Sequence, residues 1–344
     1  MKIGILTHPQ GVNYGGILQC YALCHSLGKL GHRTIVLRRE RNRSNFLWEF
    51  ARNLLKRFHF PRYYNKEFID KSQNIRRFVE AHLERTSPIK SNNAILNVCK
   101  KQCLDAVIVG SDQVWRRDFA LCFGYNYFLD FVPKDVKKMS YAASFGLSEW
   151  EYTLDETANI KKLIDRFCGV SLREESGVKL CEDNLNINPI QLIDPTMLLN
   201  VEDYNSLASK RQITDKYVFI YWLGDKNEAG NLKTEYEAKG YRVEIVNLRD
   251  NNILPSVEQW LSYIKYSNLV ITDSFHGCVF SILYEKSFIL KSNASGGVSR
   301  LKSLLNMLDI QWTDGVISPD YEAVDLKINA FRQQANEFLI KGLS

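Results

Sequence analysis

Apolar and polar positions follow two alternating periods along this chain, and the alternation predicts strands separated by helices. A short apolar run at residues 2–7 leads into the turn cluster GVNYGG, and apolar residues then recur at helical spacing between residues 17 and 30. Gly31 ends the predicted helix, and RTIVLRR forms the next strand. A strand, a helix and a second strand within so short a stretch predict parallel pairing.

The same alternation continues in two blocks. The first block ends near residue 200, and the polar residues 201–216 suit a linker to the second. The remaining strand patterns lie, in chain order, at residues 104–110, 138–145, 169–174, 217–224, 242–248, 269–274 and 287–291. In the second block the helical patterns lie at residues 226–239, 256–267, 275–286 and 321–344.

These blocks predict an α/β protein with two Rossmann-like domains that face a cleft, an architecture of the GT-B type. The first domain covers residues 1–200 and carries a helical insertion at about 41–104. The second domain covers residues 217–320, and the final helix, 321–344, is expected to cross back to the first domain. Ligands of such sheets bind outside the carboxyl ends of the strands.

The composition is that of an ordinary globular protein. Hydrophobic residues make up 45% and charged residues 24% of the 344 residues, which is enough for two cores. No apolar run approaches the roughly 20 residues of a membrane span, and the N-terminus lacks the pattern of a signal peptide. We therefore expect a cytoplasmic protein. The net charge of +6 is too mild to argue for nucleic acid.

The eight cysteines predict neither disulfides nor a metal site. Cys20 and Cys24 form one close pair and Cys99 and Cys103 another, but no second cysteine or histidine pair accompanies either. We interpret them as reduced core thiols, which suits a cytoplasmic protein.

The stretch LVITDSFHG, residues 269–277, carries the clearest chemical signal. A strand runs directly into a helix that Ser274 can cap, which places His276 in the first helical turn at the carboxyl end of a strand. Backbone N–H groups between Ser274 and Gly277 attract anions there. His276 is a candidate general acid or base. The plainer interpretation is a histidine that only hydrogen-bonds the surface between the domains.

Three loops of the first domain offer groups that suit a sugar. Paired glycines in NYGG either let the backbone approach a ligand or only form a tight turn. VGSDQVW supplies a carboxylate, an amide and a flat apolar ring, or else a helix cap and a core tryptophan. The small residues of SYAASFG indicate a close backbone approach. The candidate sugar-binding residues are Asn13, Tyr14, Gly15, Gly16, Ser111, Asp112, Gln113, Trp115 and Ser144.

Two arginines are candidate anion ligands. Arg173 ends a strand pattern, and Arg300 opens a helix after a glycine-rich loop. A guanidinium group binds a carboxylate or a phosphate through two parallel hydrogen bonds. A surface salt bridge of Arg173 with Glu174 or Glu175 is the competing interpretation.

Taken together, these motifs resemble the polysaccharide pyruvyl transferase family. The motifs occur in the same order as in that family and extend from the first strand to about residue 310. They are NYGGILQCYAL, VGSDQVW, SYAASFG, SLREES, the Asp194-Pro195-Thr196 turn, TDSFHGCVFSIL and SRLKSLL. The resemblance implies a GT-B-like fold and transfer of pyruvate from phosphoenolpyruvate to a sugar, with release of phosphate. It also implies that His276 is catalytic and that Arg173 and Arg300 hold phosphoenolpyruvate, for which the helix start at Ser274 and Gly277 is suited.

On this hypothesis the first domain takes a glycan or a lipid-linked saccharide and the second takes phosphoenolpyruvate, with no further cofactor and no metal. Two other hypotheses stay open. One is a GT-B glycosyltransferase that uses a nucleotide sugar, although the second block lacks a clear acidic clamp for a ribose. The other is a non-catalytic sugar- or anion-binding protein of the same fold, against which the joint presence of His276, Arg173 and Arg300 argues.

Residues 38–62 combine eight basic and two acidic residues with interleaved aromatic and aliphatic side chains. Such a surface suits an anionic lipid or a lipid-diphosphate substrate, and it predicts contact with the inner face of a membrane. The alternative is a solvated helical flap that packs its apolar face on the core. We expect helices at the rim of the acceptor side, where charge reversal of Arg52, Lys56 and Arg57 would weaken the use of a lipid-linked acceptor.

Overall fold

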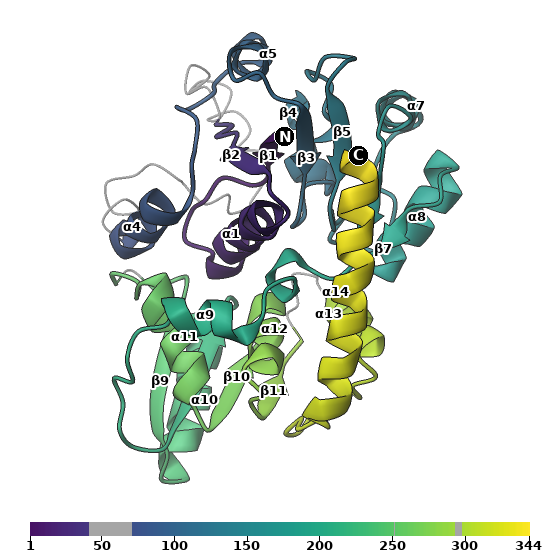
Figure 1. The fold of residues 1–344 in the computed structure, drawn as a ribbon. Helices are drawn as coiled ribbons and strands as arrows, with labels where there is room; N and C mark the ends of the chain where they lie inside the picture. The colour runs from purple at the N-terminus through teal and green to yellow at the C-terminus, as the bar shows by residue number, and fades with distance from the viewer. Residues whose placement is uncertain (41–70, 251, 293–297) are drawn as a thin grey trace, which may run out of the picture.

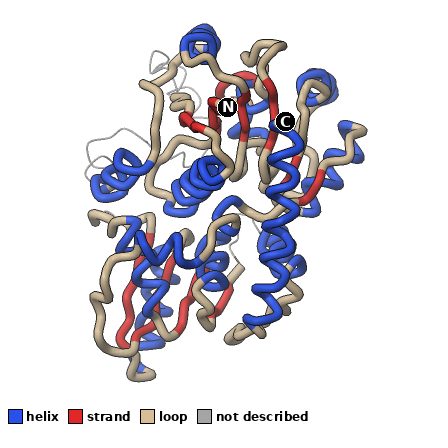
Figure 2. Tube along the Cα trace, in the orientation of Figure 1, coloured by secondary structure: helices blue, strands red, loops and turns tan. Residues whose placement is uncertain are grey.

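The computed structural model describes residues 1–40, 71–250, 252–292 and 298–344, which form two α/β domains stacked one on the other (Figure 1). Each domain has one four-stranded sheet (Figure 2), and β6 and β7 form a further parallel pair in the first domain. The first sheet has the order β2-β1-β3-β5 and the second the order β11-β10-β8-β9. All pairs in both sheets are parallel, so the carboxyl ends of the strands in each sheet share one edge.

The first domain contains, in chain order, β1 (Lys2–Leu6), α1 (Tyr14–Lys29), β2 (Arg33–Val36), α4 (Gln73–His82), α5 (Asn92–Lys101), β3 (Ala106–Val109), α6 (Arg117–Ala120), β4 (Cys122–Tyr125), η1 (Asn126–Phe128), β5 (Lys137–Ser140), α7 (Leu154–Ile164), β6 (Ser171–Leu172), α8 (Glu175–Leu185), β7 (Ile190–Gln191) and η2 (Pro195–Met197). The rest of the chain contains α9 (Val201–Leu207), β8 (Tyr217–Trp222), α10 (Lys226–Ala238), β9 (Arg242–Asn247), α11 (Val257–Tyr266), β10 (Leu269–Thr272), α12 (Phe275–Leu283), β11 (Phe288–Leu290), α13 (Val298–Met307) and α14 (Tyr321–Leu343).

The central strands are buried on both faces because helices cover both sides of each sheet. Every residue of β3 and of β8 is buried, as expected for the continuous apolar runs of parallel strands. One hydrophobic core runs from α1 in the first domain to α11 and α12 in the second. The two domains therefore meet through apolar packing as well as through polar groups.

Helix α14 ties the two domains together, as its path along both in Figure 1 shows. The Tyr321 hydroxyl at its start donates to the carbonyl of Lys286 in the second domain. Near its end, the Leu343 carbonyl accepts a hydrogen bond from Lys137 Nζ of β5 at 3.0 Å. Between them, Arg332 donates to the backbone carbonyls of Met197, at the end of η2, and of Leu199.

Three segments differ from the sequence-based expectation. The predicted linker 201–216 contains helix α9, which the Asn200–Asp203 capping box starts. The predicted strand 138–145 ends at Ser140, since Ala142 adopts a positive φ of 46° and only isolated bridges continue beyond it. The strand expected at 169–174 is reduced to the two residues of β6.

The insertion is described only from residue 71 onward. Its helix α4 contacts the second domain, where Leu254 N–H donates to the Lys71 carbonyl and Leu254 carbonyl accepts from Asn74, each at 3.0 Å. In the described ranges, no helix is long and apolar enough to cross a membrane.

Candidate functional site

The carboxyl end of β10 carries the residue at the centre of the site. Ser274 caps α12 by accepting a hydrogen bond from the Gly277 N–H at 3.3 Å, so His276 lies in the first turn of the helix. A Cβ at Gly277 would lie 2.2 Å from Thr272 Oγ1, which shows that this glycine lets the helix pack on the strand. His276 is only 5% exposed, because the first domain covers it.

Helix α1 approaches His276 so closely that only glycine fits at its start. An ideal Cβ at Gly15 would lie 2.0 Å from both Cγ and Nδ1 of His276. Gly15 is a helical residue, so the alternative of a tight turn is wrong at this position. The backbone at Gly15 closely approaches the imidazole of His276, and the predicted approach to a ligand stays a prediction. At Gly16, in contrast, a Cβ would make an ordinary contact with Asp112 Oδ2 at 3.6 Å.

A buried network of ion pairs connects the loops that follow β3, β6 and β7. Arg173 Nη1 donates to Asp194 Oδ2 at 2.7 Å, and Arg173 Nη2 lies 3.6 Å from Asp112 Oδ1. The same Asp194 oxygen lies 3.7 Å from His276 Nε2. That distance is too long for a hydrogen bond and short enough for an ion pair when the imidazole is protonated. Asp194 therefore connects an arginine of the first domain to the histidine of the second.

Local hydrogen bonds hold Asp194 in this position. The Thr196 N–H and hydroxyl donate to Oδ1 at 3.0 and 2.7 Å, and the Ser111 hydroxyl lies within hydrogen-bond distance of Oδ2 at 3.2 Å. The Arg173 guanidinium also lies 4.4 Å from the centre of the Phe275 ring. Ser111, a predicted sugar-binding residue, is fully buried and serves to hold this carboxylate.

Helix α13 brings Arg300 of the second domain to the same network. The helix docks on the first domain through Ser303, whose Oγ accepts hydrogen bonds from the Glu175 N–H at 3.0 Å and from Gln191 Nε2 at 2.8 Å. Arg300 makes no ion pair within the described ranges, although the charges of Asp112 and Glu174 are near enough to act on it.

Burial and mutual charge set the pKa values of these groups. Burial acts to raise the pKa of Asp194, but His276 and Arg173 overcome it and hold that pKa well below its ordinary value. Burial lowers the pKa of Arg300 to about 10, and the like charge of Arg173 contributes to the same shift. Arg300 is thus a cation held in an environment that disfavours its charge.

Buried polar atoms without hydrogen-bond partners gather at this junction. Within the described part of the chain they include His8 Nε2, Arg116 Nε, Arg173 Nε and Nη2, Glu174 Oε2, His276 Nε2 and Arg300 Nε. Guanidinium N–H groups can only donate, and buried donors are rarely left unpaired. The arrangement can therefore bind an anion that has several oxygen atoms. No cluster of three or more histidine, cysteine or acidic side chains that could hold a metal ion occurs among the described residues.

Two aromatic residues predicted to contact a sugar are buried in the cores. Tyr14 stacks on Trp260 with 5.2 Å between ring centres, and its hydroxyl donates to the Pro255 carbonyl at 2.7 Å. Trp115 is fully buried and stacks on Phe128. Neither ring presents a flat face to a ligand in this structure, which corrects that prediction. Tyr14 instead anchors the first domain on the second.

The other predicted sugar-binding residues divide into two groups. Asn13 caps α1 by accepting the Gly16 N–H at 3.3 Å, and the Ser144 hydroxyl accepts the N–H two residues further on. These two side chains hold local backbone. Asp112 and Gln113 are partly exposed at the junction, so they keep surface for a ligand.

Sequence reasoning did not assign Asp194, Glu174 or His8 to the site. Each follows a parallel strand, and a charged or titratable residue at the carboxyl end of such a strand is the signal that could have found them. Burial raises the pKa of Glu174 against the charges of the neighbouring arginines. Burial lowers the pKa of His8, whose ring packs edge-on against Phe119 and Tyr127.

Most of the basic segment 38–62 lies outside the described residues, so its predicted helices and membrane contact stay predictions. Two of its arginines are described. Arg38 pairs with Glu40 at 2.6 Å, and Arg39 is buried and donates to Asn126 Oδ1 at 2.8 Å. Both therefore make internal contacts.

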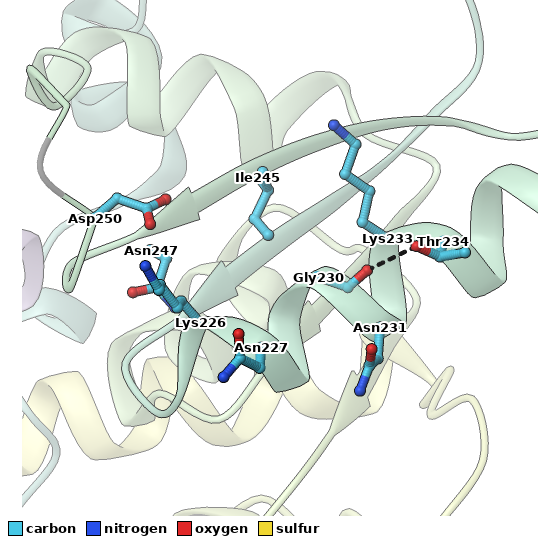
Figure 3. A pocket seen from close by; sticks show the side chains of 9 residues that line it. All are labelled: Lys226, Asn227, Gly230, Asn231, Lys233, Thr234, Ile245, Asn247 and Asp250. Atoms are coloured by element: carbon cyan, nitrogen blue, oxygen red, sulfur yellow. Dashed lines mark hydrogen bonds between the residues drawn. The ribbon is translucent and has the colours of Figure 1, made fainter.

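Two cavities lie in the second domain outside this network. One of about 440 Å³ lies between α10 and β9 (Figure 3), and one of about 570 Å³ lies beside the end of α13. His276 lines neither of them. Access of a ligand to His276 thus depends on the contact between the two domains.

The two parallel sheets, with polar residues gathered where the domains meet, define a protein of the GT-B-like class. A putative UDP-N-acetylglucosamine 2-epimerase from Listeria monocytogenes is similar in structure, with a TM-score of 0.52, 12% identity, and 98% of this chain and 94% of that chain covered. The UDP-GlcNAc 2-epimerase from Methanocaldococcus jannaschii gives a TM-score of 0.48 at 12% identity, with 96% and 92% covered. Likeness at such low identity concerns the fold alone.

The sequence model of the polysaccharide pyruvyl transferase family matches residues 13–295, and the chain belongs to this family. The family resemblance and the fold class expected from the sequence are thereby confirmed. Comparison with curated proteins found no match.

Proposed function

We propose that this protein transfers pyruvate from phosphoenolpyruvate to two hydroxyl groups of a sugar, forming a cyclic ketal and releasing phosphate. The observation that carries the proposal is the set of buried, unpartnered nitrogen atoms of Arg173, Arg300 and His276 where the domains meet. Phosphoenolpyruvate carries a carboxylate and a phosphate. Two guanidinium groups beside a helix N-terminus suit both anions.

The two arginines have different parts in this proposal. The ion pair with Asp194 fixes the Arg173 guanidinium in place. Its Nε and Nη2 make no hydrogen bond, so these two atoms can donate to the ligand. Arg300 has no ion pair in the described ranges, and its pKa is lowered to about 10 chiefly by burial. A bound anion would offset the unfavourable burial of the Arg300 charge, so we assign the larger share of phosphoenolpyruvate binding to Arg300.

His276 carries the proton transfers. A proton added to the methylene carbon gives an oxocarbenium-like centre, which the first sugar hydroxyl attacks while losing its proton. The bond from this carbon to the phosphate oxygen then breaks, and the second hydroxyl closes the ketal and loses its proton. The protons balance, because two come from the sugar hydroxyls while one goes to carbon and one to phosphate. An imidazole close to the phosphate can serve several of these steps in turn.

Asp194 is a positioning residue in this scheme. Its Oδ2 lies 2.7 Å from Arg173 Nη1 and 3.7 Å from His276 Nε2, and its pKa is held well below the ordinary value by these two groups. As a fixed negative charge it holds the Arg173 guanidinium beside the His276 ring. The family's polysaccharide acceptor would enter from the first domain, where Asp112 and Gln113 are partly exposed.

Binding requires the junction to open, because His276 is 5% exposed and lies against Gly15. The proposal therefore includes a small separation of α1 from α12 when phosphoenolpyruvate enters. The alternatives are a glycosyltransferase that uses a nucleotide sugar and a binding protein without catalysis. The match of this chain to the polysaccharide pyruvyl transferase family favours the transfer of pyruvate over both.

The test is an acceptor screen with phosphoenolpyruvate, read by mass spectrometry. The proposal predicts a product that has gained one pyruvyl group less one water, together with one phosphate released per product. Transfer of a glycosyl unit from a nucleotide sugar in the same assay would support the glycosyltransferase. Binding of phosphoenolpyruvate without phosphate release on any glycan would contradict catalysis.

A further inference from the structure

A polar pocket of about 440 Å³ lies between α10 and β9, and none of its lining residues belongs to the network at the domain junction. One wall is formed by α10, through Lys226, Asn227, Gly230, Asn231, Lys233 and Thr234 (Figure 3). Ile245, Asn247 and Asp250, from β9 and the turn after it, form the other wall. The volume falls within the range of about 300–1,000 Å³ that is usual for small-molecule sites.

Asn247 points to a ligand in this pocket. The residue is only 2% exposed, and its Oδ1 accepts the Arg249 N–H at 2.7 Å. Its Nδ2 is buried and has no hydrogen-bond partner among the described residues. Buried amide donors are rarely left unpaired. An oxygen atom of a ligand in the pocket would satisfy this one.

Gly230 opens space on the opposite wall. Glycine inside a helix is less favourable than alanine, so its presence in the middle of α10 needs a reason. Packing within the protein does not supply one, since a Cβ at this position would meet nothing within 4 Å. The Thr234 hydroxyl turns back to the Gly230 carbonyl at 3.1 Å, which Figure 3 marks with a dashed line. The helix surface facing β9 is therefore left flat and open.

The charges on the walls define the class of ligand. Lys226 lies at the start of α10, and the Asp250 carboxylate lies on the opposite side of the pocket. Lys233, two turns further along the helix, lies 3.8 Å from Glu237. Lysine ammonium groups suit a phosphate, whereas amides and a carboxylate suit sugar hydroxyls. Ile245 is the one apolar side chain among the lining residues, and none of them is aromatic, so a nucleobase would find no surface for stacking.

We infer that this pocket binds a sugar that carries a phosphate group, with the phosphate toward Lys226 and the hydroxyls toward Asn247 and Asp250. The inference does not depend on the proposed transfer of pyruvate, because the pocket shares no residue with the junction.

Titration calorimetry on the full chain tests the inference with four probes: α-D-glucose 1-phosphate, D-glucose, inorganic phosphate and UDP. We expect the sugar phosphate to bind at least about tenfold more tightly than glucose or phosphate alone, because it alone uses both sets of groups. Lys226→Ala should weaken its binding about tenfold. Lys239→Ala is the matched control, since Lys239 pairs with Glu235 at the far end of the same helix.

Gly230→Leu separates binding from folding. Leucine is the better helix former, and its Cβ meets no other atom, so the melting temperature should stay level or rise. The side chain should nevertheless fill the pocket and reduce sugar phosphate binding by tenfold or more. Wild-type affinity in Gly230→Leu, equal affinity for inorganic phosphate alone, tighter binding of UDP, or no binding of the sugar phosphate at all would each overturn the inference.

Discussion

Replacing Gly15 with alanine adds one methyl group at the tightest contact between the domains. The new Cβ would lie 2.0 Å from Cγ and Nδ1 of the His276 ring and 2.5 Å from the His276 Cβ. Carbon atoms do not approach so closely, so the ring and α1 must separate by about 1 Å. The opposing atoms belong to a buried side chain at the first turn of α12 and cannot simply swing into solvent.

The expected magnitudes follow from this displacement. Overpacking a core costs about 1–3 kcal/mol, and the change from glycine to alanine inside a helix returns about 0.5–1 kcal/mol. We therefore expect a small loss of stability, at most about 2.5 kcal/mol. A shift of about 1 Å in a group that transfers protons costs on the order of 100-fold in rate. The loss of phosphate release from phosphoenolpyruvate should thus be far larger than the loss of stability suggests.

The assay measures kcat/KM for phosphate release alongside the melting temperature. A matched control lies on the same helix. In Gly28→Ala the new Cβ meets no atom within 4 Å, so this variant should keep wild-type activity and match or exceed wild-type stability. If Gly15→Ala behaves like Gly28→Ala in both measurements, the close contact with His276 has no part in function and the reasoning fails.

The remaining predictions concern charges at the junction. Arg300→Ala should raise KM for phosphoenolpyruvate about 10- to 150-fold, because the variant loses a hydrogen bond to a charged group. Its stability in calorimetry should stay almost unchanged, because this arginine has no ion pair in the described ranges. Arg173→Ala should in addition destabilise the fold by about 3–5 kcal/mol, since it leaves Asp194 buried without its main partner. An equal effect of Arg300→Ala and Arg173→Ala on stability would contradict the different roles given to the two arginines. Asp194→Asn should lower the unfolding free energy at pH 7. The difference in unfolding free energy between variant and wild type should shrink below about pH 4, because the Asp194 carboxyl of the unfolded wild type then binds a proton, whereas the folded one, with its depressed pKa, does not. A difference that widens as the pH falls from 5 to 3 in urea titrations would refute that linkage.

Local sequence patterns were sufficient for the fold. The period of apolar residues located the four strands of the second sheet and the helices between them to within a few residues. Patterns were weaker where strands are short. At β5 and β6 the apolar run continues past the strand, and the positive φ of Ala142 that interrupts it has no sequence signal.

The site was only partly predictable, for a physical reason. His276 and Arg173 were found because each follows a strand directly. Whether Tyr14 faces a ligand or a core depends on how the domains dock, whereas Trp115 is buried by packing within the first domain. Local sequence carries no information on either contact. Asp194 was seen as part of a turn, but its role became visible only when the fold placed it between an arginine and a histidine from different domains.

The central claim is that His276 transfers protons to and from phosphoenolpyruvate at the domain junction. The most direct test is the rate of phosphate release from phosphoenolpyruvate by His276→Ala, with an acceptor that the wild type uses. His32→Ala, at the start of β2 and away from the junction, serves as the control. The account predicts a fall of about 10²–10⁴-fold for His276→Ala, the usual range for the loss of a general acid or base, with wild-type turnover in His32→Ala. Near-wild-type turnover in a correctly folded His276→Ala protein would contradict it.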